Sequence, residues 1–413
     1  MRSGHLSEYF EGVGVKTLSV VDATPSKSNQ HEVGTTRDMR RFLGEERRRF
    51  EVSYVWLGAE QESITERGQA THYNAREKQT HRGPEWRLYY PSNPVTEVMG
   101  AGDTLFVAKR AGDDLLFIVT PKGSTIQNQL LWLFGFSSQP ELRFQTQEFT
   151  GDEDAELDFT ARLILEEIGV EFEDPEANSL DTIIDRFGTT FPKTVEFSDL
   201  ARMTLPEVDA RADPDAALIA WISHEEALFR RLERRAVASR VEEGFGSGDE
   251  LDIESFLRFS LQVQNRRKSR MGRAFENHLE AVFRAFRLRF EPQAVTEQGN
   301  TVDFLFPGLA EYHDPAYPAE FLTMLAAKST CKDRWRQVLP EARKIWPKHL
   351  VTLEPAISAA QTEQMQAEGL QLVVPTSVQT SYNQRQRESI ISLADFINLV
   401  LDRGLTRVLS SRD

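Results

Sequence analysis

The sequence contains little cysteine and has no long apolar segment. Its 413 residues include one cysteine, Cys331, so no disulfide can form within them, and this favours a reducing, cytoplasmic environment. The longest nearly continuous apolar run, Leu130 to Phe136, is far shorter than the roughly 20 residues of a membrane-spanning helix. The first residues, MRSGHLSEYFEGVG, lack the apolar stretch of a signal peptide. We therefore expect a cytoplasmic protein without a membrane span.

The net charge of −15 argues against nucleic-acid binding only at first sight. Nearly all of the acidic excess falls in residues 151–210, and the rest of the chain is close to neutral with local basic clusters. Phosphate binding depends on a local basic patch rather than on the total charge. Composition therefore does not exclude a DNA-binding protein.

Length and composition predict a globular protein of two domains. Hydrophobic residues make up 40% of the chain and charged residues 27%, which is typical of globular domains, and the length exceeds that of one ordinary domain. We expect a mainly-β domain over residues 1–140, an acidic linker over 141–186 and an α/β domain over 187–413. Strands in the first domain are expected at 15–21, 52–57, 86–90, 104–109 and 115–120, with a short helix at 37–43 and closure as a small barrel or sandwich.

The second domain shows alternating helical and strand patterns. This alternation predicts an α/β layer fold around a central sheet. Helices are expected at 273–290, 332–346, 357–368 and 392–403, and strands at 302–306, 322–327, 349–353 and 370–374.

Acidic and basic residues follow one another on these elements in a pattern that suits phosphodiester hydrolysis. Asp303 lies inside the apolar strand VDFLF, Lys328 ends the strand LTMLAAK, Glu341 lies in the following helix, and Glu276 lies on the helix upstream. Hydrolysis of a phosphodiester needs carboxylates that hold Mg²⁺ and a cation near the scissile phosphate. The spacing alone also arises by chance, but burial of Asp303 is costly unless it is paired or bound to metal.

The segment after Lys328 carries side chains that suit base recognition. Arginine can donate to both acceptors of guanine, and aspartate can accept from cytosine, so the run Lys332–Asp333–Arg334 suits a G·C pair. A solvated helix start with an internal ion pair is the alternative. A second basic run leads into the Glu276 helix and suits phosphate contacts, although such runs are also found on solvated faces. Its members are Arg266, Arg267, Lys268 and Arg270.

The second half of the chain resembles the catalytic domain of the EcoRII-type (type IIE) restriction endonucleases. The resemblance rests on NRRKSRMGRAFENHLEAVF, VDFLFPGLAEYHD and LAAKSTCKDRWRQVLPEARKI. It implies a PD-(D/E)xK nuclease fold, metal ligation by Asp303 and Glu341, a catalytic Lys328 and a supporting acid at Glu276. It further implies that Lys332–Asp333–Arg334 reads CC/GG ends of the site.

Two positions depart from the usual motif of this fold. Val302 stands where a proline usually precedes the aspartate, and Ala326 stands where an acid usually lies two residues before the lysine. Glu341 would replace that acid, as it does in the family.

The first half resembles, more weakly, the effector domain of the same family. That domain is a DNA-binding pseudobarrel related to plant B-three transcription factor domains. VKTLSVVDATPSKSNQHEVG is similar to its first recognition arm and ATHYNAREKQTHRGPEWRLYY to its second. Ordinary solvated hairpins are the alternative. The candidate DNA contacts are Lys27, Asn29, His31, Arg76, Lys78, Arg82 and Arg87.

The family also implies a pocket for bases flipped from the centre of the site. Trp221 is the aromatic residue in the corresponding segment, AALIAWISHE. Packing in a helix core beside Leu218 and Ile222 is the alternative, and we favour it slightly.

We therefore expect a Mg²⁺-dependent type II restriction endonuclease. It would act as a homodimer on double-stranded DNA at a short palindrome with CC/GG ends, under control of the N-terminal domain. A non-catalytic, sequence-specific DNA-binding regulator on a nuclease fold is the alternative, and RNA as the substrate is not excluded by composition.

Overall fold

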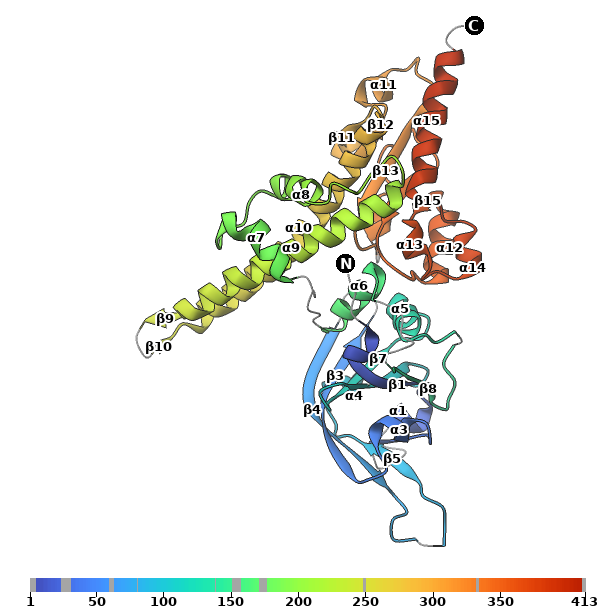
Figure 1. Ribbon diagram of the computed structural model, residues 1–413. Coiled ribbons are helices and arrows are strands. Elements are labelled where there is room, and N and C mark those ends of the chain that lie inside the picture. The colour runs from blue at the N-terminus through green and yellow to red at the C-terminus, as the bar shows by residue number, and fades with distance from the viewer. Residues whose placement is uncertain are drawn as a thin grey trace. The chain divides into compact units, whose positions relative to one another are not determined.

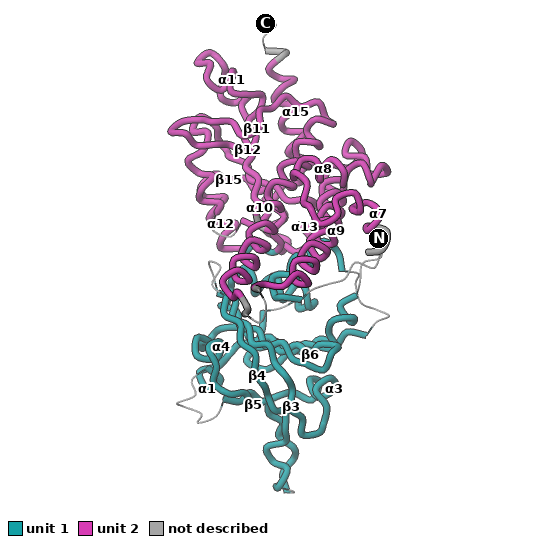
Figure 2. The backbone as a smooth tube through the Cα atoms, turned by 90° about the vertical axis from the view of Figure 1, so that its left-hand side faces the viewer, with its two compact units in different colours: residues 1–172, 356–358 teal, residues 173–355, 359–413 magenta. Residues whose placement is uncertain are grey.

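A computed structural model describes residues 5–23, 31–58, 63–79, 81–137, 139–150, 157–170, 177–247, 250–331 and 334–410. The chain divides into two compact units (Figure 2). Unit 1 consists of Met1–Phe172 with Ala356–Ser358, and unit 2 of Glu173–Pro355 with Ala359–Asp413. None of the described helices is both long enough and apolar enough to cross a bilayer.

Unit 1 is built on one eight-stranded sheet with the strand order β2-β5-β4-β3-β7-β6-β1-β8. Neighbouring strands are antiparallel except for β3 and β7, which are parallel. No pairing within the described residues joins the end strands β2 and β8, so these hydrogen bonds form an open sheet. The strands are β1 Phe10–Thr17, β2 Glu32–Gly34, β3 Arg48–Leu57, β4 Ser63–Asn74, β5 Trp86–Tyr89, β6 Thr104–Arg110, β7 Leu115–Thr120 and β8 Gln145–Glu148.

A hydrophobic core lies on each face of this sheet. In β7, Leu115 and Phe117 belong to one core, and Leu116 and Ile118 belong to the other. A strand that is buried on both faces needs a continuous apolar sequence rather than an alternating one, which explains the run LLFIVT. The helices of unit 1 are α1 Val20–Ala23, α3 Met39–Leu43, α4 Pro94–Val98, α5 Thr125–Leu133 and α6 Phe159–Glu167.

The strand expected at residues 15–21 ends earlier than predicted. β1 stops at Thr17, and α1 begins at Val20. The Ser19 backbone N–H donates to the Asp22 carboxylate over 2.8 Å, and the Asp22 N–H donates back to the Ser19 hydroxyl over 3.3 Å. Such reciprocal bonds stabilise the first turn of a helix, so the chain leaves the sheet here.

The segment expected to be an acidic linker, residues 141–186, is largely folded. β8 pairs with β1, with Glu148 opposite Gly12. Ile164 and Leu165 of α6 lie in a core of unit 1. The apolar residues of α6 recur at helical spacing. Because acidic residues surround this segment, its composition indicates a linker instead. The most acidic stretch, residues 151–156, lies outside the described residues.

Unit 2 contains a mixed five-stranded sheet in the order β11-β12-β13-β14-β15. β11, β12 and β13 are antiparallel, whereas β13, β14 and β15 are parallel. This sheet brings the strands of Asp303 and Lys328 together. The strands are β11 Glu291–Val295, β12 Thr301–Phe306, β13 Thr323–Lys328, β14 Lys348–Thr352 and β15 Leu370–Val373.

Two long helices, α9 and α10, run side by side as a hairpin in unit 2 (Figures 1 and 2). The short strands β9 Gly246–Ser247 and β10 Glu250–Leu251 lie at its tip. The helices of unit 2 are α7 Ala177–Ile184, α8 Thr194–Met203, α9 Pro214–Glu243, α10 Ile253–Ala285, α11 Leu309–His313, α12 Ala359–Ala367, α13 Thr376–Gln379, α14 Gln384–Arg387 and α15 Leu393–Ser410.

The prediction of a helix at residues 332–346 is wrong. Only a short 3-10 helix, Arg334–Gln337, forms in the described part of this segment, and turns follow it. Pro340 lacks the N–H that a helix interior requires, and Ala342 has a φ of 43°, in the left-handed region. Glu341 therefore lies in a turn rather than on a helix.

Candidate active site

An aspartate and a lysine meet where β12 pairs with β13. Asp303 is buried within β12, and Lys328 is the last residue of β13. The Lys328 Nζ donates to Asp303 Oδ2 over 2.8 Å, and the Ala327 backbone N–H donates to the same oxygen over 2.8 Å. The buried carboxylate thus has a charged donor and a backbone donor, which offset the cost of removing it from water.

Glu276 approaches this pair from α10. Its Oε2 accepts from Arg273 Nη1 over 2.9 Å and from Gln293 Nε2 over 3.2 Å. The same Gln293 nitrogen lies 3.3 Å from Asp303 Oδ1, so one amide bridges two carboxylates. Burial raises the pKa of Glu276, and the negative charge of Asp303 raises this pKa further.

Glu341 is the most strongly perturbed acid of the cluster. Burial raises the pKa of its carboxyl to about 8, the positive charge of Lys328 opposes this rise, and the charge of Asp303 adds to it. Glu341 Oε2 is buried and has no hydrogen-bond partner among the described residues. The turn that carries it is held by buried Lys348, whose Nζ donates to the Ala342 carbonyl over 3.0 Å and to the Glu341 carbonyl.

The cluster therefore contains the four residues that the sequence pointed to. Hydrogen bonds link Asp303 to Lys328 directly and to Glu276 through Gln293, and the charges of Asp303 and Lys328 act on the pKa of Glu341. A buried carboxylate with an unsatisfied oxygen, a lysine and a second carboxylate form a polar centre that can attract a cation and an anionic substrate.

The donor set fits a magnesium ion. Within the described residues, no group of three His, Cys, Asp or Glu side chains is arranged to hold a metal. Mg²⁺ is commonly held by one or two carboxylates, with water and substrate phosphates as its other ligands. Asp303 and the unsatisfied oxygen of Glu341 match that requirement.

Two residues of this site were not identified from the sequence. Gln293 has a φ of 51°, a strained conformation for a residue with a side chain. Nothing in the sequence marks Gln293 as a residue that contacts the two carboxylates. Lys348 begins the apolar strand KHLVT, and a lysine at the start of a buried strand is a weak signal of a buried interaction.

The predicted base-reading segment is only partly described. Lys332 and Asp333 lie outside the described residues. Arg334 begins the 3-10 helix, and its Nη2 donates to the Thr330 carbonyl over 2.6 Å. The neighbouring Cys331 is buried, and its backbone N–H donates to Glu354.

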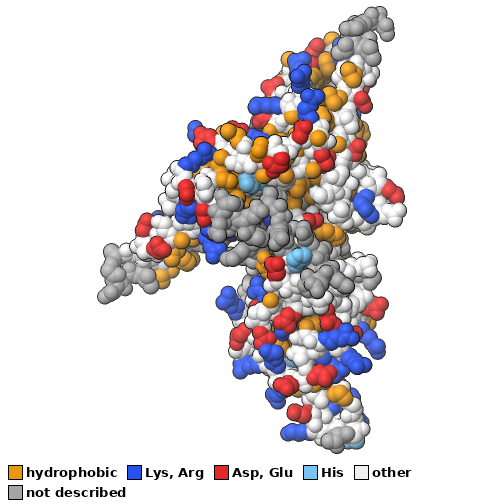
Figure 3. All heavy atoms as spheres, viewed as in Figure 1, with side chains coloured by type: hydrophobic (Ala, Val, Ile, Leu, Met, Phe, Trp, Pro, Cys, Tyr) orange, Lys and Arg blue, Asp and Glu red, His pale blue; other side chains and the backbone are white. Residues whose placement is uncertain are grey.

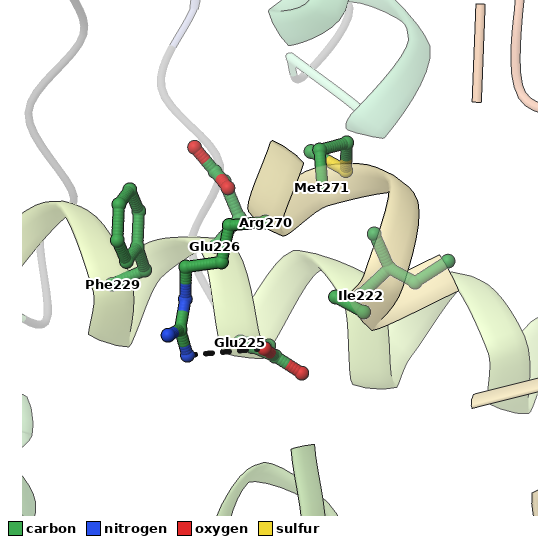
Figure 4. A pocket seen from close by; sticks show the side chains of 7 residues that line it. Ile222, Glu225, Glu226, Phe229, Arg270 and Met271 are labelled. Atoms are coloured by element: carbon green, nitrogen blue, oxygen red, sulfur yellow. Dashed lines mark hydrogen bonds and ion pairs between the residues drawn. The ribbon is translucent and has the colours of Figure 1, made fainter. Parts of the chain in front are cut away.

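The basic run on α10 differs from the predicted row of phosphate contacts. Arg270 is buried between α9 and α10, where it is 3.5 Å from Glu225, and Figure 4 shows it in a pocket with Ile222 and Phe229. Its guanidinium is held within the protein, so Arg270 is not available to a DNA backbone.

The other members of the run also have partners, or their side chains are not described. Arg267 Nε donates to Glu233 over 2.6 Å, and the Arg266 guanidinium lies 4.1 Å from the centre of the Phe191 ring. The side chain of Lys268 lies outside the described residues. The exposed parts of Arg266 and Arg267 are the described groups of this run that stay candidates for phosphate contacts.

Trp221 packs inside unit 2. Only 7% of it is exposed, and its ring centre is 6.0 Å from that of His278. The Arg202 guanidinium lies 5.9 Å from the centre of the Trp221 ring. This position matches core packing, because a stacking platform for a base needs an open ring face.

The candidate contacts of the first N-terminal arm are mostly undescribed. Lys27 and Asn29 lie outside the described residues. His31 is half-buried, with its ring centre 5.9 Å from that of Tyr90.

The second arm has both paired and exposed cations. Arg76 forms an ion pair with Glu85, and Arg87 Nε donates to Glu85 over 2.8 Å. Lys78 and Arg82 are exposed, and they are the described cations of this arm that face solvent.

The four residues of the cluster lie within a segment that matches the model of a known protein family. Residues 229–397 match the family model described as EcoRII C terminal. The type II restriction enzyme EcoRII of Escherichia coli is 44% identical over 186 residues, which cover 45% of this chain and 45% of that protein. The chain thus matches somewhat less than half the length of this relative.

Solved structures of restriction endonucleases show a more distant similarity. Metal-depleted Ecl18kI in complex with uncleaved, modified DNA has a TM-score of 0.46 at 17% identity, over 56% of this chain and 85% of that one. A complex of restriction endonuclease PspGI with substrate DNA has a TM-score of 0.43 at 15% identity, over 52% and 93%. Residues 229–397 thus match the EcoRII C-terminal family model, and over 186 residues the chain is homologous to the type II restriction enzyme EcoRII.

Proposed function

We propose that this chain is a Mg²⁺-dependent type II site-specific deoxyribonuclease that cuts both strands of DNA at a short palindrome with CC/GG ends. The observation that carries the proposal is the 2.8 Å pair of Lys328 and Asp303 beside the unsatisfied carboxylate oxygen of Glu341. Two comparisons support the same chemistry: the chain is 44% identical to EcoRII over 186 residues, and the family match at residues 229–397 includes the four residues of the cluster. A cytoplasmic location, which the single cysteine favours, is part of the proposal.

In this reaction, a water oxygen attacks phosphorus and the bond from phosphorus to the 3′ oxygen breaks. The products are a 5′-phosphate and a 3′-hydroxyl, and the proton lost by water is balanced by the one gained at the 3′ oxygen. Lys328 supplies a fixed positive charge near the phosphate oxygens, because Asp303 and its strand hold the ammonium in place.

Asp303 and Glu341 would hold Mg²⁺, which would polarise the phosphate and lower the pKa of a bound water. Glu276 completes the negative side of the cluster, and the Gln293 amide keeps it next to Asp303. Lys348 fixes the turn of Glu341, so the carboxylate stays directed at the cluster.

Recognition and symmetry follow from the same proposal. Lys332, Asp333 and Arg334 follow the catalytic strand closely, so a base edge read by them lies near the scissile phosphate. A palindrome that is read once per half-site requires a two-fold symmetric enzyme, which makes the active form a homodimer.

Unit 1 serves in this proposal as a DNA-binding effector that restrains the nuclease until a second site is bound. Its exposed Lys78 and Arg82 support a phosphate-binding role. The pseudobarrel relationship to B-three domains belongs to this part of the proposal.

The test is a comparison of cleavage and binding in single-residue variants. Lys328→Ala and Asp303→Ala should lose cleavage of duplex DNA in Mg²⁺ and keep specific binding in a gel-shift assay in Ca²⁺. Asp402→Ala, an exposed change on α15, serves as the control and should cut normally. Cleavage by Lys328→Ala near the wild-type rate would rule out this centre, and binding without cleavage by the wild type would favour a non-catalytic regulator.

A further inference from the structure

The turn that joins β11 to β12 contacts the turn that carries Glu341. The Ala342 backbone N–H donates to the Thr296 hydroxyl over 3.4 Å, and Asn300 Nδ2 donates to the Pro340 carbonyl over 3.3 Å. The first turn is closed by hydrogen bonds from the Thr296 N–H and hydroxyl to the Asn300 carbonyl, over 2.8 Å and 3.2 Å. Thr296 and Asn300 therefore hold the backbone on both sides of Glu341.

A tyrosine of α11 supports the next part of the same turn. Charged side chains face solvent around α11 (Figure 3), whereas Tyr312 of this helix is fully buried. Its hydroxyl lies 2.6 Å and 2.7 Å from the two carboxylate oxygens of Glu297, and Glu297 Oε2 accepts the Arg343 backbone N–H over 3.4 Å. Burial raises the pKa of Tyr312, and the hydrogen bond to Glu297 raises it further, so the hydroxyl stays protonated and donates. A buried donor thus directs Glu297 toward this turn.

These contacts complement those of Lys348. Lys348 donates to carbonyl oxygens of the turn, whereas Thr296 and Glu297 accept its N–H groups. Lys348 belongs to β14, which is separated from the strand of Asp303 by β13. Thr296 and Glu297 belong instead to the connection between β11 and β12, and Asp303 lies in β12. They therefore connect the backbone around Glu341 directly to the hairpin that carries Asp303.

We propose that three residues behind the site position the Glu341 carboxylate relative to Asp303. They are the positioning residues Thr296, Glu297 and Tyr312. Mg²⁺ demands near-ideal geometry with ligand distances of about 2.0–2.1 Å, so a small displacement of one carboxylate weakens the site. Residues behind metal ligands typically contribute about 10–100-fold to metal affinity or activity. The inference rests on the proposed function, because that proposal supplies the metal and the reaction.

Loss of the Thr296 hydroxyl should act on the Glu341 turn and not on the sheet. Ala342 is fully buried, so a variant without this hydroxyl leaves a buried N–H without its acceptor, which is costly. The pairing of β11 with β12 consists of backbone hydrogen bonds and does not use the hydroxyl. We therefore expect the turn to open more often while the hairpin stays paired.

The first experiment follows hydrogen exchange by mass spectrometry in the full-length, metal-free protein. Thr296→Val keeps the size of the side chain and removes the hydroxyl, so peptides that cover residues 338–346 should exchange roughly tenfold faster than in the wild type. Thr296→Ser keeps the hydroxyl and should retain slow exchange. Thr301→Val, an exposed change at the start of β12, is the matched control and should leave exchange unchanged.

The second experiment measures Ca²⁺ binding by calorimetry on each variant bound to a duplex that carries the mapped cleavage site. Thr296→Val and Tyr312→Phe should both raise the Ca²⁺ dissociation constant, the first by roughly ten- to a hundredfold. Thr296→Ser and Thr301→Val should keep the wild-type value. The Mg²⁺ concentration for half-maximal cleavage should follow the same order, and circular dichroism checks that each variant folds.

The outcomes separate this inference from the proposed function. Unchanged exchange in Thr296→Val, or faster exchange with the wild-type Ca²⁺ affinity, overturns the positioning role and leaves the proposed function intact. Equal defects in Thr296→Val and Thr296→Ser assign Thr296 to packing alone and overturn the role as well. A wild-type enzyme that neither binds Ca²⁺ nor cuts DNA contradicts the proposed function and this role with it, even where exchange confirms the contacts.

Discussion

The Lys328 Nζ lies 2.8 Å from Asp303 Oδ2 in the interior of the unit 2 sheet. The pair joins two neighbouring strands, and the Ala327 N–H contacts the same oxygen. The other carboxylate oxygen of Asp303 faces Gln293, which also contacts Glu276. A single aspartate thus positions the lysine and connects to a second acid, so the site is organised around it.

The pKa of Glu341 predicts a pH-dependent stability in metal-free protein. Its carboxyl has a pKa of about 8 in the folded state, against an ordinary value of 4.5 for a glutamate in water. Between these values the folded state binds a proton that the unfolded state has released, so the free energy of unfolding falls as pH rises from about 4.5 to about 8. Below pH 4.5 the carboxyl is protonated in both states, and the contribution is constant.

Glu341→Gln should remove this fall. In EDTA, the loss of stability between pH 5 and pH 8 should be smaller than in the wild type by roughly 2–4 kcal/mol. Urea unfolding at several pH values measures it, and Glu320→Gln, an exposed change, is the control. If the free energy of unfolding falls equally with pH in wild type and in Glu341→Gln, the folded state does not keep a proton on this carboxyl between pH 5 and pH 8.

Gln293→Ala should weaken the response to magnesium. The Gln293 amide donates to both carboxylates, so its removal leaves Glu276 and Asp303 to repel each other. Loss of such outer contacts typically costs about 10–100-fold in metal affinity or activity. The Mg²⁺ concentration for half-maximal cleavage should therefore rise, while DNA binding in Ca²⁺-free buffer should not change.

The control for this change is Gln384→Ala, at an exposed position on α14. A Gln293→Ala enzyme with the wild-type Mg²⁺ response would mean that the amide has no part in positioning the carboxylates.

Arg334→Ala should reduce base discrimination. Removal of a base-edge contact should cost about 1–3 kcal/mol of discrimination per half-site. Arg336→Ala in the same 3-10 helix, where the guanidinium lies 4.7 Å from the centre of the Trp335 ring, is the matched control. Competition between cognate and random duplexes measures the effect, and an equal loss on both duplexes would contradict the assignment of Arg334 as a base reader.

Removal of unit 1 should activate the nuclease on DNA with one site. A fragment of Glu173–Asp413 contains all four residues of the proposed catalytic cluster and lacks the proposed effector. It should cut single-site DNA faster than the full chain does. If unit 1 only adds affinity, the fragment will instead be slower on every substrate.

The sequence predicts the strands of the site well, because β12 and β13 are buried and carry a polar residue in an otherwise apolar run. Asp303 and Lys328 stand out for that reason, but such spacing also arises by chance, and their catalytic roles were predicted from the resemblance to the EcoRII-type endonucleases. Helical periodicity predicts the wrong structure for Glu341, because Pro340 and the left-handed φ of Ala342 do not fit a helix and place Glu341 in a turn.

Other parts of the site depend on tertiary placement. Gln293 contacts the two carboxylates from a position in β11 where its backbone φ is 51°. Arg270 belongs to a basic run in the sequence, but its burial against Glu225 becomes evident only when α9 and α10 pack. Sequence alone shows the charge of such a residue and not the partner that holds it.

The most direct measurement is an end-mapped digest of plasmid DNA of known sequence by the full-length chain. With Mg²⁺, sequencing of the products should show breaks at one short palindrome with CC/GG ends, with 5′-phosphates on both strands, and no breaks with Lys328→Ala. Scattered breaks without a common sequence, or no breaks by the wild type in Mg²⁺, would contradict the account.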